Sequence, residues 1–445
     1  MKKLLFTLSL TVSVLLAQET SSDTFLLSET IKKMLTNNPK LQESIYNYMR
    51  VGKDLEIADH GYYPTLDLLA SYGYEKVRSS STNDAYHSGM RKEAQLTLTQ
   101  NIYNGNATQS RIFQERSRLD AAAYSVAEQA DRLSLQMTSA YLTVIKEKML
   151  LDLAQENVST HEEIYAQIKD RTESGFGRVS EQRQAGSRLT LAQSNLVAQE
   201  NNYNDALNTF EKLAGFKVDA GQLTIPNLLV GLPQSEATIK EKAFTCNPSL
   251  LVQKANIALA QHLQEGAKAP FRPTLDFEAY ARVGDDIAAV DGRNDSYAAL
   301  LKLRYNLYNK GIDSLSKEKS DLLVQKEKEA LETLKRDLNE SLRFSWQSYV
   351  LNQKKLGFLE EHKNFSKETL EAYKEEFKIG RRDLINLLDA EGEYYSARRE
   401  IVTTENDLLY AKYRLLDNMG LLSDSFEPGF SKRYIQGACS IDENL

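Results

Sequence analysis

The tetrapeptide Pro-Thr-Leu-Asp occurs at residues 64–67 and again at residues 273–276, an offset of 209 residues. Four further matches keep the same order along the chain. They are Asn38-Pro39 with Asn247-Pro248 at the same offset, and residues 101–104 with 306–309, 175–185 with 380–390, and Gly215 with Gly420 at an offset of 205. Because the period is far longer than the 20–50 residues of solenoid repeats, the chain is predicted to consist of two large homologous halves.

Both halves have the same predicted order of elements. A short helix (27–37 and 236–246) precedes the Asn-Pro pair, and a medium helix follows it (39–60 and 248–268). Two strands come next, and then a very long helix, a Gly-marked turn and a second helix. This order divides the chain into a first repeat at 18–215, a connector at 216–235, a second repeat at 236–420 and a tail at 421–445.

The predicted strands are residues 63–76, 92–104, 273–283 and 297–308. Apolar and polar residues alternate along them with a period of two, which is typical of transmembrane barrel strands with one face toward lipid and one toward the lumen. A half-buried sheet of a water-soluble protein gives the same pattern. Four strands cannot close a barrel, since membrane barrels have at least eight, so the barrel interpretation requires several chains.

The predicted long helices carry apolar residues in steps of three and four, as coiled coils do. The first runs from Gly105 to about Thr172, which at 1.5 Å per residue corresponds to roughly 100 Å. No compact core needs such a length, so these helices are predicted to form a tube or a bridge.

Composition and charge exclude several classes of function. Gly and Pro together number 29 of 445 residues, about half their usual share, which favours long helices. The net charge of -7 argues against binding of nucleic acid. Five scattered His and two Cys leave little material for a metal site, and phosphate-binding loops and nucleophile motifs are missing from the sequence. We therefore expect neither a cofactor nor an enzymatic activity.

The first 17 residues have the pattern of a secretory signal peptide, with Lys2 and Lys3 before an apolar run that ends near Ala17. Export to an oxidising compartment would permit a disulfide between Cys246 and Cys439. Their separation in sequence does not decide the pairing, and unpaired thiols are the preferred interpretation.

The most specific segment covers residues 377–391, FKIGRRDLINLLDAE. With the duplicated helix–strand–strand–helix order, it makes nearly all of the chain after the signal peptide resemble the TolC family of outer membrane channels, and within it the members that serve type I protein secretion. The resemblance implies an α+β membrane protein. Its long helices would form a coiled-coil barrel, and four strands from each of three protomers would form a twelve-stranded transmembrane β-barrel.

The resemblance also implies the setting of the protein. A homotrimer would lie in the outer membrane, in contact with its lipid, with a helical tunnel in the periplasm. A periplasmic adaptor protein and an inner-membrane ABC or RND pump would dock at its helical tip. The preferred cargo is a secreted protein, and efflux of drugs, metals or small molecules is the alternative. A periplasmic coiled-coil scaffold without a pore is a third interpretation, although a scaffold would not need the four strands.

The resemblance assigns roles to residues at the two helical turns. Asp389 would line the pore constriction, with Asn386 where the family often has a second aspartate, so the charged ring would be weaker. Arg382 would hold the closed state against Glu181 and Ser180 of the other hairpin. Phe377 stands where some members have a tyrosine that supplies another gate bond. Gly175, Gly177 and Gly380 are interpreted as residues of the turns.

Overall fold

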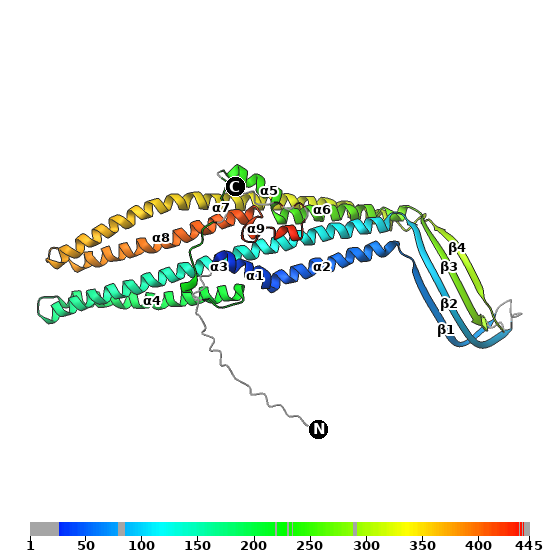
Figure 1. The fold of residues 1–445 in the computed structure, drawn as a ribbon, viewed down its shortest axis with the longest axis horizontal. Helices are drawn as coiled ribbons and strands as arrows, with labels where there is room; N and C mark the ends of the chain where they lie inside the picture. The colour runs from blue at the N-terminus through cyan, green and yellow to red at the C-terminus, as the bar shows by residue number, and fades with distance from the viewer. Residues whose placement is uncertain are drawn as a thin grey trace, which may run out of the picture.

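The computed structural model describes residues 26–435 except 79–84, 219, 229–230, 234 and 288–291, and also describes Gly437 and Cys439. The expected signal peptide at residues 1–17 lies outside these residues. The chain is elongated, with a sheet at one end, the turns of two helical hairpins at the other, and a waist between them where short helices gather (Figure 1).

The two halves contain the same elements in the same order. The first contains α1 (Leu27–Asn37), α2 (Pro39–Asp59), β1 (Thr65–Arg78), β2 (Tyr86–Asn104), α3 (Ala107–Glu173) and α4 (Val179–Ala214). The second contains α5 (Glu236–Cys246), α6 (Pro248–Gly266), β3 (Thr274–Asp285), β4 (Ser296–Arg304), α7 (Ile312–Lys378) and α8 (Leu384–Asn418). A short helix, α9 (Leu422–Phe426), begins the tail. The expected duplication of the fold is therefore confirmed.

The Asn-Pro pairs close each half in the same way. The Asn38 side chain accepts a hydrogen bond from the Lys40 amide at the start of α2, and donates one to the Leu213 carbonyl near the end of α4 at 3.3 Å. Asn247 caps α6 and donates to the Asn418 carbonyl at the end of α8 at 3.1 Å. Proline fits the first turn of a helix because its missing N–H is not needed there. One asparagine thus starts the medium helix and anchors the end of the hairpin.

The four strands form one antiparallel sheet in the order β1-β2-β3-β4 (Figure 1). Its register places the alternating residues on two distinct faces, with Leu66 opposite Leu98 on one and Asp67 opposite Thr97 on the other. The apolar face is exposed in the single chain, including Leu68, Tyr72, Leu301 and Leu303. Among the described residues, none of the helices has both the length and the apolar character needed to cross a membrane.

Strand ends differ from the sequence prediction, most clearly in β2 and β4. β2 begins at Tyr86 rather than at residue 92, because the whole of β1 up to Arg78 pairs with it. β4 ends at Arg304 rather than at residue 308, because its partner β3 begins opposite it at Thr274. Beyond that point no strand of the described part of the chain pairs with the backbone. The alternation of apolar and polar residues continues to Tyr308, which is why the sequence predicts a longer strand.

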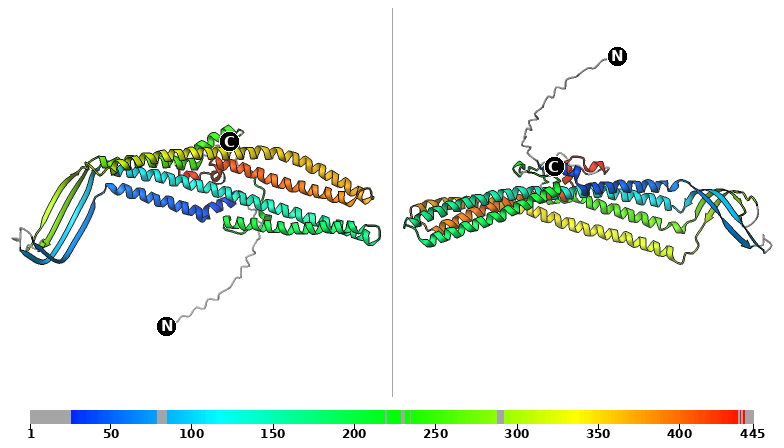
Figure 2. Two further views of the ribbon diagram at one scale, coloured as in Figure 1. Left: turned by 180° about the vertical axis from the view of Figure 1, so that it is seen from behind. Right: turned by 90° about the horizontal axis from the view of Figure 1, so that it is seen from below.

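The helices form a single wall whose order changes at the waist. On the sheet side, α3 packs between α2 and α6, and α6 packs against α7. On the side of the turns, α3 packs between α4 and α8, and α8 packs against α7. The two views of Figure 2 show these helices running nearly parallel over the length of the molecule. The edges of the wall are therefore α2 and α7 on the sheet side of the waist, and α4 and α7 on the side of the turns.

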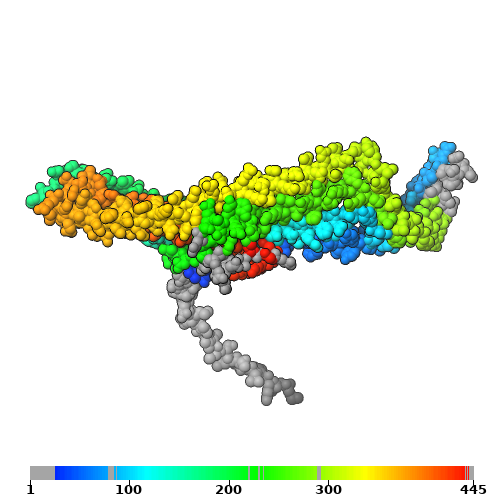
Figure 3. Space-filling view, turned by 90° about the horizontal axis from the view of Figure 1, so that it is seen from above, coloured from blue at the N-terminus to red at the C-terminus, as the bar shows by residue number. Residues whose placement is uncertain are grey.

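The main hydrophobic core lies at the waist, where α1, α5 and the tail cover the long helices. Its largest fully buried side chains include Tyr141, Tyr413 and Phe210. The connector is fixed there, since the Tyr141 hydroxyl donates to the Thr224 carbonyl at 2.9 Å and accepts from the Thr224 amide. In the space-filling view the C-terminal residues (red) lie against the same region (Figure 3).

A disulfide joins Cys246 to Cys439, so the preference for unpaired thiols was wrong. The two Cα atoms lie 5.7 Å apart although 193 residues separate the cysteines in sequence. The fold brings them together because the end of α8 and the tail that follows it lie against the end of α5. Gly420 adopts a φ of +70°, and a Cβ there would lie 2.8 Å from the Cys246 carbonyl oxygen.

Two acidic side chains, the buried Asp131 and the half-buried Asp417, lie where the tail meets the long helices. Asp131 of α3 is almost fully buried and accepts a hydrogen bond from the Ser423 amide at 2.7 Å. Burial, and then the Asp417 carboxylate, raise the pKa of Asp131 to about 8. Burial also raises the pKa of Asp417 to about 6, against the opposing effect of Arg414 and Arg132.

These acids predict a waist that loses stability as the pH rises. Both folded-state pKa values exceed the ordinary value of 3.8, so ionisation costs more in the folded than in the unfolded chain. For Asp131 alone, the loss between pH 6 and 8 is about 2 kcal/mol. Thermal unfolding followed by circular dichroism should give a lower transition temperature at pH 8 than at pH 6, and Asp131→Asn should reduce that difference. An unchanged pH dependence in the variant would contradict this explanation.

Candidate functional site

The two hairpin turns lie at the same end of the molecule, farthest from the sheet (Figure 1). Gly175 and Gly380 have φ values of +82° and +72°, a conformation that L side chains rarely adopt. A Cβ at Gly177 would lie 2.7 Å from the Thr172 hydroxyl and 2.8 Å from the Thr172 amide nitrogen. The three glycines therefore occupy positions where the backbone geometry of the turns requires them.

An apolar cluster joins the two hairpins just above these turns. It combines Ile164 and Ile168 of α3, Ala185 of α4, and Leu384 and Leu388 of α8. Phe377 of α7 packs against the same cluster, and the Arg171 guanidinium lies 5.2 Å from the centre of its ring. Phe377 thus contributes a cation–π contact between the hairpins, at the position where some members of the family have a tyrosine.

Asp389 lies on the exposed side of α8, and 61% of its side-chain surface is accessible. Arg188 of α4 approaches its carboxylate at 3.2 Å, so an ion pair crosses from one hairpin to the other. Asn386, one turn earlier, is half-buried. The charge that Asp389 presents to solvent is therefore partly balanced by a residue that sequence reasoning did not identify.

Arg382 is held within its own hairpin. Its guanidinium contacts the Glu376 carboxylate at 2.6 Å and lies 3.9 Å from the centre of the Tyr373 ring. Glu181 lies in the first turn of α4, next to the exposed Ser180. Among the described residues, no ion pair joins Arg382 to Glu181. The expected contact is thus not formed within one chain, and its formation between chains stays a prediction.

A second ion pair joins the hairpins further from the turns. Arg398 of α8 donates two hydrogen bonds to the Glu156 carboxylate of α3, at 2.7 and 2.8 Å. These hydrogen bonds lower the pKa of Glu156. A bidentate arginine–carboxylate pair fixes relative orientation better than a lysine contact does. Three arginines, Arg188, Arg398 and Arg171, therefore add ion-pair and cation–π contacts between the hairpins to the apolar cluster, and the family motif indicated none of them.

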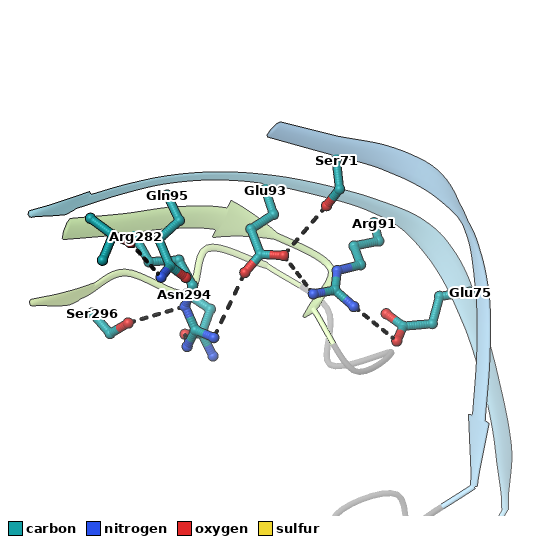
Figure 4. Close-up of polar contacts among 9 residues, drawn as sticks. Ser71, Glu75, Arg91, Glu93, Gln95, Arg282, Asn294 and Ser296 are labelled. Carbon is teal, nitrogen blue, oxygen red and sulfur yellow. Dashed lines mark hydrogen bonds and ion pairs between the residues drawn. The ribbon is translucent and has the colours of Figure 1, made fainter. Parts of the chain in front are cut away.

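The polar face of the sheet carries its own charged network at the end far from the helices (Figure 4). Glu93 of β2, whose side chain is only 6% exposed, forms ion pairs with Arg91 and with Arg282 of β3, and accepts a hydrogen bond from Ser71 of β1. Arg91 also reaches Glu75, and Arg282 donates to Ser296 and Asn294. The network ties three strands and the start of β4 together on one face.

The arrangement at the turns offers charged side chains and apolar packing rather than a coordination sphere. Within the part of the chain that the structure describes, no group of three or more His, Cys, Asp or Glu side chains could hold a metal ion. What the turns can do chemically is present carboxylates and guanidinium groups to solvent and exchange ion-pair partners when the hairpins move.

Comparison with known proteins places this geometry in a family. The family model described as outer membrane efflux protein matches residues 30–216 and 241–421. The chain is 22% identical to outer membrane protein TolC of Escherichia coli over 89% of this chain and 83% of the relative. It is 23% identical to proteases secretion protein PrtF of Dickeya chrysanthemi, over 88% of this chain and 87% of that protein.

Solved structures agree with this assignment at the level of the fold. The outer membrane protein VceC of Vibrio cholerae superposes with a TM-score of 0.77 at 15% identity, over 88% of this chain and 96% of VceC. The family model covers most of the chain, in two segments that each contain one half of the duplicated fold. The chain therefore belongs to the outer membrane efflux protein family and is an outer membrane channel protein of the TolC type, not an enzyme.

Proposed function

We propose that three copies of this chain form the outer membrane exit duct of a type I protein secretion system, gated at its helical turns by an adaptor and an inner-membrane pump. The observation that carries the proposal is that the chain is an open segment of a wall. Among the described residues, the sheet ends in two unpaired edges, β1 and β4, and the helical wall ends in α2 or α4 on one side and α7 on the other.

The edges of the helical wall carry nearly all of its exposed large apolar side chains. Among the described residues, the inner helices α3, α6 and α8 contribute only Phe113 and Ile385. The edge helices contribute Tyr46, Met49 and Ile57 on α2, Val179, Leu191 and Val197 on α4, and Ile312, Leu315, Leu322, Phe344, Leu351, Phe358 and Phe365 on α7. Such surface is typical of helices that pack against another subunit.

On α7 the exposed residues form a regular stripe. Phe344, Leu351, Phe358 and Phe365 are spaced seven residues apart, which is the spacing of a coiled-coil seam. At 100° per residue the stripe lies about 130° around the helix from the α8-facing side that contains Leu342 and Ser345. In a closed ring of twelve helices, the two neighbours of each helix lie about 150° apart. The position of the stripe therefore supports packing of α7 against α4 of a neighbouring copy.

The sheet has the surface expected of a membrane-spanning wall. Its exposed apolar face is flanked by aromatic residues at both ends, Tyr62 and Tyr63 toward the helices and Tyr72, Tyr74 and Tyr297 toward the far end. Aromatic girdles at both interfaces characterise barrels of the outer membrane. Three copies would supply twelve strands, with the polar face and its charged network toward the lumen.

In this assembly the turns would form the periplasmic opening. Three copies of Asp389 would surround the axis and attract cations, as rings of carboxylates do in pores. Arg382 would contact Glu181 and Ser180 of a neighbouring copy in the closed state. Exposed pairs of this kind contribute about 1 kcal/mol or less, so docking of an adaptor can displace them.

The proposed ring of Asp389 carboxylates predicts opposite effects of substitutions at Asp389 and at Arg188 on block of the channel by cations. Asp389→Ala is expected to weaken block of the channel by multivalent cations by about tenfold or more, because the ring of charge is lost. Arg188→Gln is expected to strengthen the block, because the Asp389 carboxylates lose their neighbouring positive charge. Single-channel conductance in lipid bilayers with a trivalent cation on the periplasmic side measures both. Block that is unchanged in Asp389→Ala would show that the ring assignment is wrong.

The likeness to PrtF, a proteases secretion protein, and the segment at residues 377–391 support a protein as cargo. The family description, outer membrane efflux protein, keeps drug, metal or small-molecule efflux as the second candidate. Deleting the chain and comparing the secreted proteome with susceptibility to drugs and metals separates the two. Loss of a secreted protein with unchanged susceptibility is the expected result. Intact secretion with new sensitivity would move the assignment to efflux.

A further inference from the structure

A groove of about 260 Å³ lies at the waist between the two hairpins. Leu142 and Met149 of α3 form one wall, Val402 and Leu409 of α8 form the other, and Pro226 of the connector closes one end. The groove is positioned by the hydrogen bonds between Tyr141 and Thr224, which hold the connector against α3 immediately before Ile225 and Pro226. Its volume matches a small ligand more closely than a helix or a strand.

The groove lies between α3 and α8, the two inner helices of the wall on the side of the turns. It is therefore separated by a whole helix on each side from the edges at which another copy of the chain would pack. The exposed apolar residues of those edges do not line it. An occupant of the groove need not compete with assembly of the channel.

One carboxylate in the groove lacks a close cationic partner. Glu405 of α8 lies in the groove beside the apolar side chains. Among the described residues, no Lys, Arg or His nitrogen lies within 4 Å of its carboxylate. Burial first, and the Glu360 carboxylate of α7 second, raise the pKa of Glu405, while Lys363 of α7 opposes them. Lys146, the cation in the groove, is paired with Glu147 at 2.9 Å.

We infer that this groove is a binding site for a compact apolar molecule that carries an ammonium group, with the ammonium at Glu405 and the apolar body between α3 and α8. Predominantly apolar walls with a small number of polar groups are the usual composition of small-molecule sites. An ammonium group would form an ion pair with the Glu405 carboxylate. A neutral or anionic ligand of the same shape would leave the charge of that carboxylate uncompensated. The site is independent of which cargo the channel carries.

Three probes of one shape and different charge test this inference. They are 1-adamantanamine, 1-adamantanol and 1-adamantanecarboxylate, titrated calorimetrically into the purified full-length assembly in detergent. The amine is expected to bind at least about tenfold more tightly than the alcohol or the carboxylate, since a charge-assisted hydrogen bond contributes about 1.5 kcal/mol or more.

Two variants of the same helix complete the test. Glu405→Gln is expected to bring the affinity for the amine down to that for the alcohol. Asp407→Asn removes an exposed acid on α8 that does not line the groove, and should leave the affinity unchanged. Equal binding of all three probes, an unaltered affinity in Glu405→Gln, or absence of amine binding to the wild-type assembly would each overturn the inference. None of these results would bear on the proposed export function.

Discussion

Replacing Phe358 and Phe365 with glutamate is expected to leave a folded chain that no longer assembles. Both side chains are exposed on α7, in the stripe that faces away from α8. Packing each of them against a neighbouring copy contributes about 1.5 to 3 kcal/mol, so each seam of a trimer would lose about 3 to 6 kcal/mol. Burying two carboxylates in an apolar seam adds a further desolvation cost.

Light scattering after size-exclusion chromatography in detergent measures the assembly, and circular dichroism measures the helical content. The expected result is a monomer with the helicity of the wild type. Phe358→Leu with Phe365→Leu is the matched control, since it keeps the seam apolar and should still assemble. A glutamate variant that forms trimers as stable as the wild type would show that the stripe does not lie between copies.

The architecture could be predicted because each strand and helix has one face toward solvent or lipid and one face toward its neighbours, which makes its apolar residues periodic in the sequence. A period of two places Leu66 and Asp67 on opposite faces of β1, and steps of three and four align Leu338 and Leu342 toward α8. Duplication doubled the available signal, since each element could be checked against its counterpart in the other half. The exceptions are the start of β2 and the end of β4, which depend on the length of the partner strand and not on the strand's own pattern.

The turns could be located, but their ion pairs could not. Glycines with positive φ leave a signal in the sequence, and Gly175 and Gly380 match at one offset. The partner of an arginine depends instead on how each helix is rotated about its axis. Arg382 could reach acids on either hairpin, and it pairs with Glu376 across its own turn.

Contacts between distant segments were the least predictable feature of the site. Arg188 pairs with Asp389, 201 residues away, and Arg398 pairs with Glu156, 242 residues away. Exposed arginines and acids are abundant on every long helix, so composition does not single these out. The disulfide belongs to the same class, because only packing of the tail on the end of α5 brings Cys439 to Cys246.

Removing the disulfide is expected to have the second large effect, on the stability of the waist. The bond closes a loop of 193 residues that contains the second half of the fold from α6 onward. Loop-closure entropy for that length corresponds to about 5 kcal/mol as an upper figure. For a chain of this size, Cys246→Ser with Cys439→Ser should lower the unfolding temperature by roughly 5 to 10 °C. Thermal unfolding of the oxidised wild type and the double variant measures the difference.

Reduction distinguishes loss of the covalent bond from damage by the substitutions. A thiol reductant should lower the unfolding temperature of the wild type to that of the double serine variant and leave the variant unchanged. The tail also has non-covalent anchors, the Ser423 amide on Asp131 and the edge-to-face contact of Tyr434 with Tyr48 at 5.7 Å. If these anchors hold the tail without the bond, both proteins will unfold at the same temperature and resist proteolysis after Leu421 equally well. If the bond supplies the constraint, the variant will lose its C-terminal residues first, at temperatures where the long helices are intact.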